Sequence, residues 1–406
     1  MSNNKATSQE RGSLDLFCRT TIEEIKKIFK DEAMLIFFIL VPLLYPLLYS
    51  WIYTNEVVRE VPVAVVDMSR SSMSREFIRK FDASPDTRVA FYCNSVDEAK
   101  NLIGKQEAFG ILYFPTDFNI NTNRMEQSHV SIYSDMSFML YYKNILQTAT
   151  AVAGKMNEKI QISRAGNMTE REDEITIKPL DFDEVQIFNT TGGYGNFIIP
   201  GVLMLIIQQT LLLGAGITAG TSRERGLGMG QALHGNTTGS MLMSLTGRAT
   251  AFFLIYAIMT AYLTLIVPRI FSFTSILQGG DLLCFMLPYL LACIFFSITL
   301  SSMMKHREDV MLIVVFSSVP LLFMSGVSWP QSSIPEFWQW VSAIFPSTFG
   351  IRGFVRMNTM GAMLEDVRPE YIMLWVQTVF YFTTSLIAFM LSNKKTKQEA
   401  QTENAQ

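Results

Sequence analysis

The sequence predicts an α-helical polytopic membrane protein with six transmembrane helices and an inserted extracytoplasmic α/β domain. Six apolar stretches carry the first part of this prediction. Each has the length of about 20 residues that a bilayer core requires, and none contains Asp, Glu, Lys or Arg. A polar insertion of roughly 140 residues between the first two stretches is long enough to be a domain. The stretches are Ala33 to Ile52, Asn196 to Gly220, Ala249 to Val267, Leu282 to Met304, Val310 to Val327 and Tyr371 to Leu391.

The positions of basic residues indicate which ends of these stretches lie on the cytoplasmic side of the membrane. An even number of spans places both termini on one side, and Lys and Arg near spans mark the cytoplasmic side. Both tails are basic, so we expect residues 1–32 and 393–406 to be cytoplasmic. The first transmembrane helix then covers 33–53, the extracytoplasmic α/β domain 54–192, and a five-helix transmembrane region 193–392.

The tail before the first span contains an amphipathic helix. Helical spacing places Leu14, Phe17, Ile22, Ile25 and Phe29 on one face, with the charged side chains largely elsewhere. Such a helix is suited to lie in the headgroup region. The pattern alone leaves two interpretations open, a simple membrane anchor and a coupling element.

The polar insertion alternates short strand-like and helix-like segments. Val61 to Val66 is a β-branched run, Phe138 to Arg164 predicts one long helix, and Ile175 to Ile187 is strand-like. Asp67, Asp117 and Asp135 lie near strand ends, where they are either ligand groups or, more simply, caps. The insertion shows no metal-ligand spacing, so we expect no catalytic or metal site there.

Two glutamines lie near the middle of the second apolar stretch. An unsatisfied amide in hydrocarbon costs several kcal/mol, so Gln208 and Gln209 must face protein or water. They either line a translocation path or form hydrogen bonds between helices, and the sequence leaves both possibilities open. Gly216 and Gly220 on the same stretch predict close helix packing.

A charged loop at 221–248 follows the second stretch. It begins with Arg223, Glu224, Arg225 and Gly226. Its glycines lack the lysine and the preceding strand of a phosphate-binding loop, and the chain contains no G-x-x-x-x-G-K-[ST] sequence. We therefore expect this chain to bind no cofactor, and any ATP to be used by a partner subunit.

Taken together, these features resemble the permease subunits of ABC-2 type transporters, in the bacterial branch with a large extracytoplasmic domain between the first and second of six transmembrane helices. The resemblance covers nearly the whole chain. Its motifs are the amphipathic helix, Val61 to Asp67, Phe109 to Phe118, Arg223 to Gly226, and Ser325 to Pro330 leading into Phe345 to Thr348. The chain departs from the family pattern at Leu227 to Gln231, where the family often has Thr and a Leu-rich stretch.

The resemblance implies a set of partners and sites. Arg223, Glu224, Arg225 and Gly226 would join the amphipathic helix in receiving an ABC ATPase subunit. Segment 328–350 would form short re-entrant helices at the outer gate, although a plain aromatic belt would also fit its pattern. A second permease copy or a paralogue would complete a dimer, with a periplasmic adaptor and membrane lipids as further partners and no nucleic acid.

The leading hypothesis is therefore the permease subunit of an ATP-driven exporter in the bacterial inner membrane, without enzymatic activity of its own. The alternative is a membrane-anchored receptor or assembly factor that binds through its extracytoplasmic domain and transports nothing. The charged loop beside an amphipathic helix favours the exporter, since a receptor needs neither.

Overall fold

The computed structural model describes residues 2–54, 57–166, 169–178, 185, 187–189, 192–224, 238–304 and 306–403. The chain divides into two compact units. The helical unit comprises Met1–Glu56 and Gln186–Gln406, and the α/β unit comprises Val57–Val185. Each is described by itself.

The α/β unit is built on a four-stranded sheet in the order β2-β1-β3-β4. Strand β1 pairs in parallel with β2 and with β3, whereas β4 runs antiparallel to β3. The β-branched run of the sequence forms the central strand β1 because its side chains are buried on both faces. The strands are β1 (Val61–Asp67), β2 (Thr87–Tyr92), β3 (Gly110–Phe114) and β4 (Ser131–Ser134).

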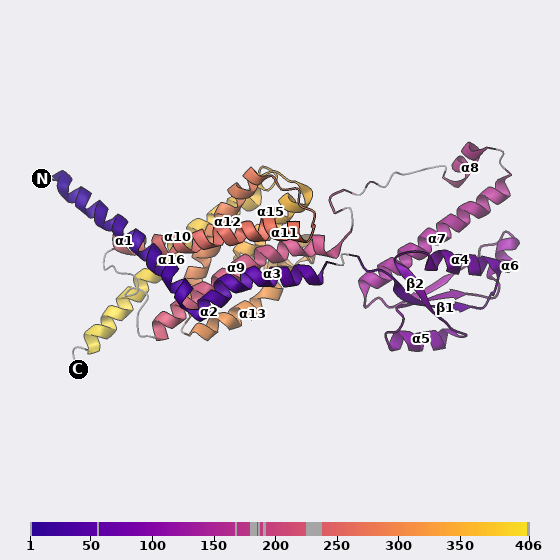
Figure 1. Cartoon of the computed structure of the whole chain (residues 1–406), viewed down its shortest axis with the longest axis horizontal. Coiled ribbons are helices and arrows are strands. Elements are labelled where there is room, and N and C mark those ends of the chain that lie inside the picture. Colours follow the sequence, from indigo (N-terminus) through magenta and orange to yellow (C-terminus); the bar gives the residue numbers. More distant parts are fainter. Residues whose placement is uncertain are drawn as a thin grey trace. The chain divides into compact units, whose positions relative to one another are not determined.

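Helices cover both faces of this sheet (Figure 1). On one face, α4 (Ser72–Asp82), α6 (Phe118–Asn123) and α7 (Met139–Ala165) bury Phe77, Phe118 and Ile145 against Val63 and Leu112. On the other face, α5 (Val96–Gly104) buries a smaller cluster. The α/β unit therefore has three layers.

The prediction of a strand at 175–187 is wrong in its described part. Residues up to Ile177 belong to helix α8 (Glu170–Ile177). The hydroxyl of Thr169 accepts the Glu172 amide, and the Glu172 carboxylate accepts the Thr169 amide. This capping box starts a helix and outweighs the β propensity of the isoleucines that follow.

The helical unit begins with α1 (Ser2–Lys30) and then follows the predicted apolar stretches. The first stretch forms α2 (Glu32–Met34), η1 (Leu35–Leu40) and α3 (Val41–Ile52). The second forms α9 (Tyr194–Glu224), and the third forms α10 (Thr238–Ala261), η2 (Tyr262–Ile266) and α11 (Val267–Ile270). The remainder forms α12 (Gly279–Ser301), α13 (Arg307–Met324), η3 (Gln331–Ser333), α14 (Glu336–Ser342), α15 (Pro346–Met360) and α16 (Arg368–Glu403).

Prolines widen two of these helices. The segments η1 and η2 are π-helical, and each is followed closely by a proline, Pro42 or Pro268. A proline inside a helix removes one backbone donor and pushes away the preceding turn. A π turn accommodates that displacement, so the helices continue through their prolines.

Five helices among the described residues are long and apolar enough to cross a membrane: Glu32–Ile52, Tyr194–Glu224, Gly239–Ile270, Gly279–Ser301 and Arg368–Leu391. Helix α13 covers most of the fifth predicted stretch, but its 18 residues include Arg307, Glu308 and Asp309 in the first turn. A sixth span there stays a prediction. Helix α10 starts at Thr238, well before Ala249, so part of the loop predicted at 221–248 is helical.

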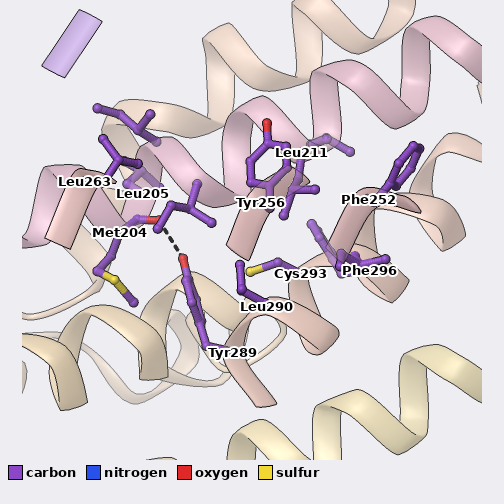
Figure 2. Packing of buried hydrophobic residues seen from close by; sticks show 14 of the residues in the cluster. Met204, Leu205, Leu211, Phe252, Tyr256, Leu263, Tyr289, Leu290, Cys293 and Phe296 are labelled. Carbon is purple, nitrogen blue, oxygen red and sulfur yellow. Dashed lines mark hydrogen bonds between the residues drawn. The ribbon is translucent and has the colours of Figure 1, made fainter. Parts of the chain in front are cut away.

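Helix α9 forms the core of the helical unit. It is apolar all round, and nearly every side chain from Gly195 to Gly220 is buried. Figure 2 shows Leu205 and Leu211 of α9 beside Tyr256 of α10 and Cys293 of α12, with the Tyr289 hydroxyl donating to the Met204 carbonyl. The neighbouring helices α12, α13 and α15 all pack on α9.

Glycines set the closest approaches to α9. A Cβ atom on Gly216 would lie 2.4 Å from Val310 Cγ2, and one on Gly220 would lie 2.5 Å from the Arg307 backbone nitrogen. Real Cβ contacts of this length essentially do not occur. The predicted small-residue packing is confirmed, and the partner is the start of α13.

The Gly220→Ala substitution tests this approach. The added methyl group would meet backbone rather than a flexible side chain, so we expect the free energy of unfolding to fall by about 1–3 kcal/mol, the usual cost of overpacking. SDS titration of the purified protein in mixed micelles measures it. The control is Gly280→Ala, which meets nothing within 4 Å. Equal stability of the two variants would contradict the close contact.

Candidate functional site

The ends of three helices meet at Arg223 and Glu224, two of the predicted coupling residues. The Arg223 guanidinium donates to the Ser302 carbonyl just after α12. The Glu224 carboxylate accepts the Arg307 amide at 3.3 Å and lies 3.8 Å from Arg307 Nε, at the start of α13. Arg225 and Gly226 lie outside the described residues. A force applied to the end of α9 would therefore reach α12 and α13 directly.

Helix α1 packs against α10 through a partly buried face. Its inner face comprises Thr20, Glu24 and Ile28, and the Thr21 hydroxyl donates to the Gly247 carbonyl at 3.1 Å. The face predicted to be apolar packs only in part against the rest of the helical unit, because the side chains of Leu14, Ile22 and Phe29 are more than half exposed. Thus α1 turns one face to protein and leaves an adjacent apolar face free for lipid, the arrangement of an interfacial helix.

A buried ion pair joins α1 to α10. Glu24 Oε1 lies 2.9 Å from Arg248 Nε, and both side chains are about 5% exposed. The Arg248 guanidinium also lies 5.4 Å from the centre of the Phe252 ring. Glu24 Oε2 is 3.5 Å from Lys27 Nζ. Losing one partner would leave the other charge buried and unpaired, which is costly, so the pair holds α1 in place.

Sequence reasoning missed this pair. The sequence pattern places Arg248 at the end of the charged loop 221–248, and it assigns no partner to Glu24. One signal was present: Glu24 shares a helical stripe with Thr20, Thr21 and Ile28, next to the apolar stripe. An acid in that position predicts a basic partner.

The turn between α14 and α15 lies level with the middle of two spans. The Gln208 side chain, midway along α9, accepts the Ser347 amide at 2.6 Å. From α16, Gln377 donates to the Ala343 carbonyl at 2.7 Å, and the Tyr381 hydroxyl donates to the Ile344 carbonyl. Backbone groups freed where a helix breaks need such partners in an apolar environment. Gln208 thus anchors the turn at 343–347.

An apolar cavity of about 260 Å³ lies beside Gln209. Its walls come from α3, α9 and α13, and its few polar side chains are those of Gln209, Thr210, Ser318 and two tyrosines. Gln209 Nε2 donates to Ser317 Oγ at 3.3 Å, while its buried side-chain oxygen has no hydrogen-bond partner among the described residues. A mostly apolar cavity with a few polar groups is typical of small-molecule sites. Of the two glutamines, only Gln209 lines this cavity.

The segment 328–350 forms η3, α14 and the start of α15. Helix α14 exposes Phe337, Trp338 and Trp340, whereas the first turn of α15 is buried. The segment therefore combines an exposed aromatic surface with a turn held deep between α9 and α16.

The aspartates of the α/β unit act locally. Asp67 accepts the Arg70 amide and the Ser74 hydroxyl, Asp135 accepts the Ser137 amide, and Asp117 accepts the Asn121 side-chain amide. In the part of the chain that the structure describes, no group of three His, Cys, Asp or Glu residues could hold a metal ion.

Comparison with known proteins gives one positive finding. The family model described as ABC-2 family transporter protein matches residues 33–387. The match runs from the start of the first span into the last, and it includes the α/β unit and the charged end of α9. No match to the chain was found among curated proteins.

The anchored turn leads to a prediction for Gln208→Leu. The substitution keeps the volume roughly constant but removes the acceptor of the Ser347 amide, and an unpaired buried donor costs about 1–3 kcal/mol. We expect a lower free energy of unfolding and faster hydrogen exchange at residues 343–350. The control is Gln209→Leu, which removes a bond to a side chain and not to the backbone. If Gln208→Leu leaves exchange at 343–350 unchanged, the anchoring role is wrong.

The buried ion pair leads to a double-mutant test. Arg248→Met alone should reduce the free energy of unfolding by about 3–5 kcal/mol because it leaves the Glu24 carboxylate buried without its partner. Glu24→Leu combined with Arg248→Met should recover much of that loss. SDS titration and the rate of proteolysis within α1 report the outcome.

The matched control for this test is Arg19→Met. Arg19 pairs with Glu23 at the surface of the same helix, and such exposed pairs contribute about 0–1 kcal/mol. An effect of Arg248→Met no larger than that of Arg19→Met would show that Glu24 and Arg248 are not buried together in the folded protein.

Proposed function

The chain belongs to the ABC-2 family of transporter proteins, and on that premise we propose that it is the permease subunit of an ATP-driven exporter. It is a multi-pass membrane protein of a family that generally works with an ABC ATPase partner, often as a dimer. We place it in the bacterial inner membrane, with both termini cytoplasmic and the α/β unit outside. The ATPase would supply the energy, and this chain the path.

The observation that carries the proposal is the junction at Arg223 and Glu224. An ATPase that docks on the loop after α9 and on α1 would act on connected parts. Glu224 links α9 to α13, Arg223 links it to the end of α12, and the Glu24–Arg248 pair links α1 to α10. Motion imposed at this end would therefore move several helices together, as alternating exposure of a cargo site requires.

The path that we propose runs along α9 between the apolar cavity and the turn at 343–347. Both features contact α9 at adjacent residues, Gln209 and Gln208. A shift of α9 would therefore change the cavity wall and the turn at once. The apolar lining fits a cargo with substantial apolar surface. A second copy or a paralogue would complete the path, and the α/β unit would pass cargo to an adaptor.

Removing the charges of Glu224 and of Arg225, the next residue in the sequence, tests the proposal. Glu224→Ala with Arg225→Ala should reduce the cognate ATPase recovered with the tagged chain about tenfold or more, since a few residues dominate most interfaces. The readout is co-purification from detergent after co-expression, with ATP hydrolysis of the complex as a second measure. The control is Glu308→Ala, an exposed acid at the start of α13.

Two results would overturn the proposal. Undiminished recovery and hydrolysis with the double variant would refute docking at this loop. Failure of the unaltered chain to recover any ATPase would favour the membrane-anchored receptor or assembly factor, which needs no energy-supplying partner.

A further inference from the structure

A polar pocket lies at the carboxyl ends of β1 and β2 in the α/β unit. It has a volume of about 710 Å³, and its walls come from the end of β1, the residues after β2 and one side of α4. In open α/β sheets the carboxyl ends of parallel strands are where ligands bind. Nothing in the proposed export function uses this pocket.

Three arginines surround the pocket: Arg70, Arg75 and Arg79. Among the described residues, none of them has a carboxylate within ion-pair distance. Arg75 is fixed by backbone carbonyls, with Nε donating to Ser71 at 3.1 Å and Nη2 to Arg70 at 3.4 Å. Arg75 and Arg79 are four residues apart on α4, so they face the same way. The pocket therefore gathers guanidinium groups whose donors are largely unused.

The two carboxylates of the pocket, those of Asp67 and Asp82, accept hydrogen bonds from neighbouring groups of the α/β unit. Asp67 accepts the Arg70 amide at 2.9 Å and the Ser74 hydroxyl at 2.7 Å, and Asp82 accepts the Val89 amide at 2.8 Å. These bonds hold the loop before α4 and tie the end of α4 to β2. The carboxylates therefore stabilise the structure around the pocket, while most N–H donors of the guanidinium groups stay available to bind a ligand.

The remaining wall is uncharged. Tyr92 is 71% exposed at the rim, and Asn94 follows it. Between them, burial together with the nearby Glu98 carboxylate raises the pKa of the Cys93 thiol, so this wall brings no thiolate charge near neutral pH. It offers an aromatic ring and an amide, which suit the organic part of a ligand.

We propose that this pocket binds a phosphate-bearing organic anion. Guanidinium groups bind phosphate oxygens through paired, charge-assisted hydrogen bonds. A tetrahedral phosphate directs its oxygens out of one plane, so arginines on different sides of the pocket can engage it together, whereas a carboxylate presents its oxygens in a single plane. The phosphate can come from a lipid headgroup or from a soluble phosphate ester, which share this chemistry.

The test uses the full chain in phosphatidylcholine nanodiscs, without any ATPase. Glycerol 1-phosphate is titrated while hydrogen exchange is followed at residues 68–79 and 92–95, with glycerol as the uncharged control. We expect glycerol 1-phosphate to slow hydrogen exchange at these residues in a saturable way, and glycerol to have no effect. Each lost arginine should weaken binding about tenfold, as expected for a hydrogen bond to a charged group. The double variant Arg70→Gln with Arg79→Gln should thus bind about a hundredfold more weakly.

The control is Arg88→Gln, which removes an exposed arginine of β2 that does not line the pocket. Arg70→Lys with Arg79→Lys keeps the charge but loses paired bonding, so it should fall between the two. Thermal unfolding confirms that each variant is folded. An equal loss of binding in the Arg88 variant, or no change in the double Gln variant, would overturn the proposal.

A second arm separates the two sources of phosphate. Nanodiscs that contain phosphatidylglycerol should show the same protection without added ligand if a lipid headgroup enters the pocket. If the ligand is a soluble phosphate ester, glycerol 1-phosphate should protect and phosphatidylglycerol nanodiscs without added ligand should not. Protection in neither arm would overturn the proposal. Because no ATPase is present, the result is independent of whether the chain exports anything.

Discussion

Buried backbone groups need hydrogen-bond partners, and at the turn 343–347 of the helical unit side chains from two spans supply them. A helix that ends among apolar side chains exposes amides and carbonyls that no water can satisfy. Gln208, Gln377 and Tyr381 supply the partners from α9 and α16. The turn consequently fixes how α9, α15 and α16 pack, and it accounts for polar side chains midway along two apolar helices.

The same principle, applied to charge, explains the contact between α1 and α10. Glu24 and Arg248 contribute little net stability as a pair, because two charges lose their hydration when they are buried. Their value lies in selectivity: α1 can sit against α10 in only one register without leaving a charge unpaired. The glycines of α9 act alongside by letting α13 approach. Orientation in this unit is therefore set by a few specific contacts within a large, unspecific apolar core.

For five of the six predicted stretches, the described helices are long and apolar enough to cross a membrane. Composition could predict these five because length and absence of charge are local properties. Composition could not predict the role of a residue whose interaction partner is distant in the sequence. Arg248 ends the predicted charged loop 221–248, yet Glu24 neutralises it within α10. Gln208 was known to need a partner, but nothing in the local pattern indicates Ser347. The strand predicted from Ile175 overlooked the capping box of α8, although that signal was local. The sequence spacing already puts Arg75 and Arg79 on one helical face, but the pocket that they line with Arg70 forms only when the ends of β1 and β2 are placed beside them.

The π-helical segment η1 has a geometric consequence for the cavity. A π turn contains about one residue more than an α turn, and one residue corresponds to about 100° of rotation around the helix. The segment η1 thus rotates the side chains of α3 around the helix axis relative to those of α2. Before it, Met34 is buried; after it, Tyr45 and Tyr49 face the cavity. Regularising Leu35–Leu40 into an α-helix would rotate the tyrosines out of the cavity wall while the helix stayed intact.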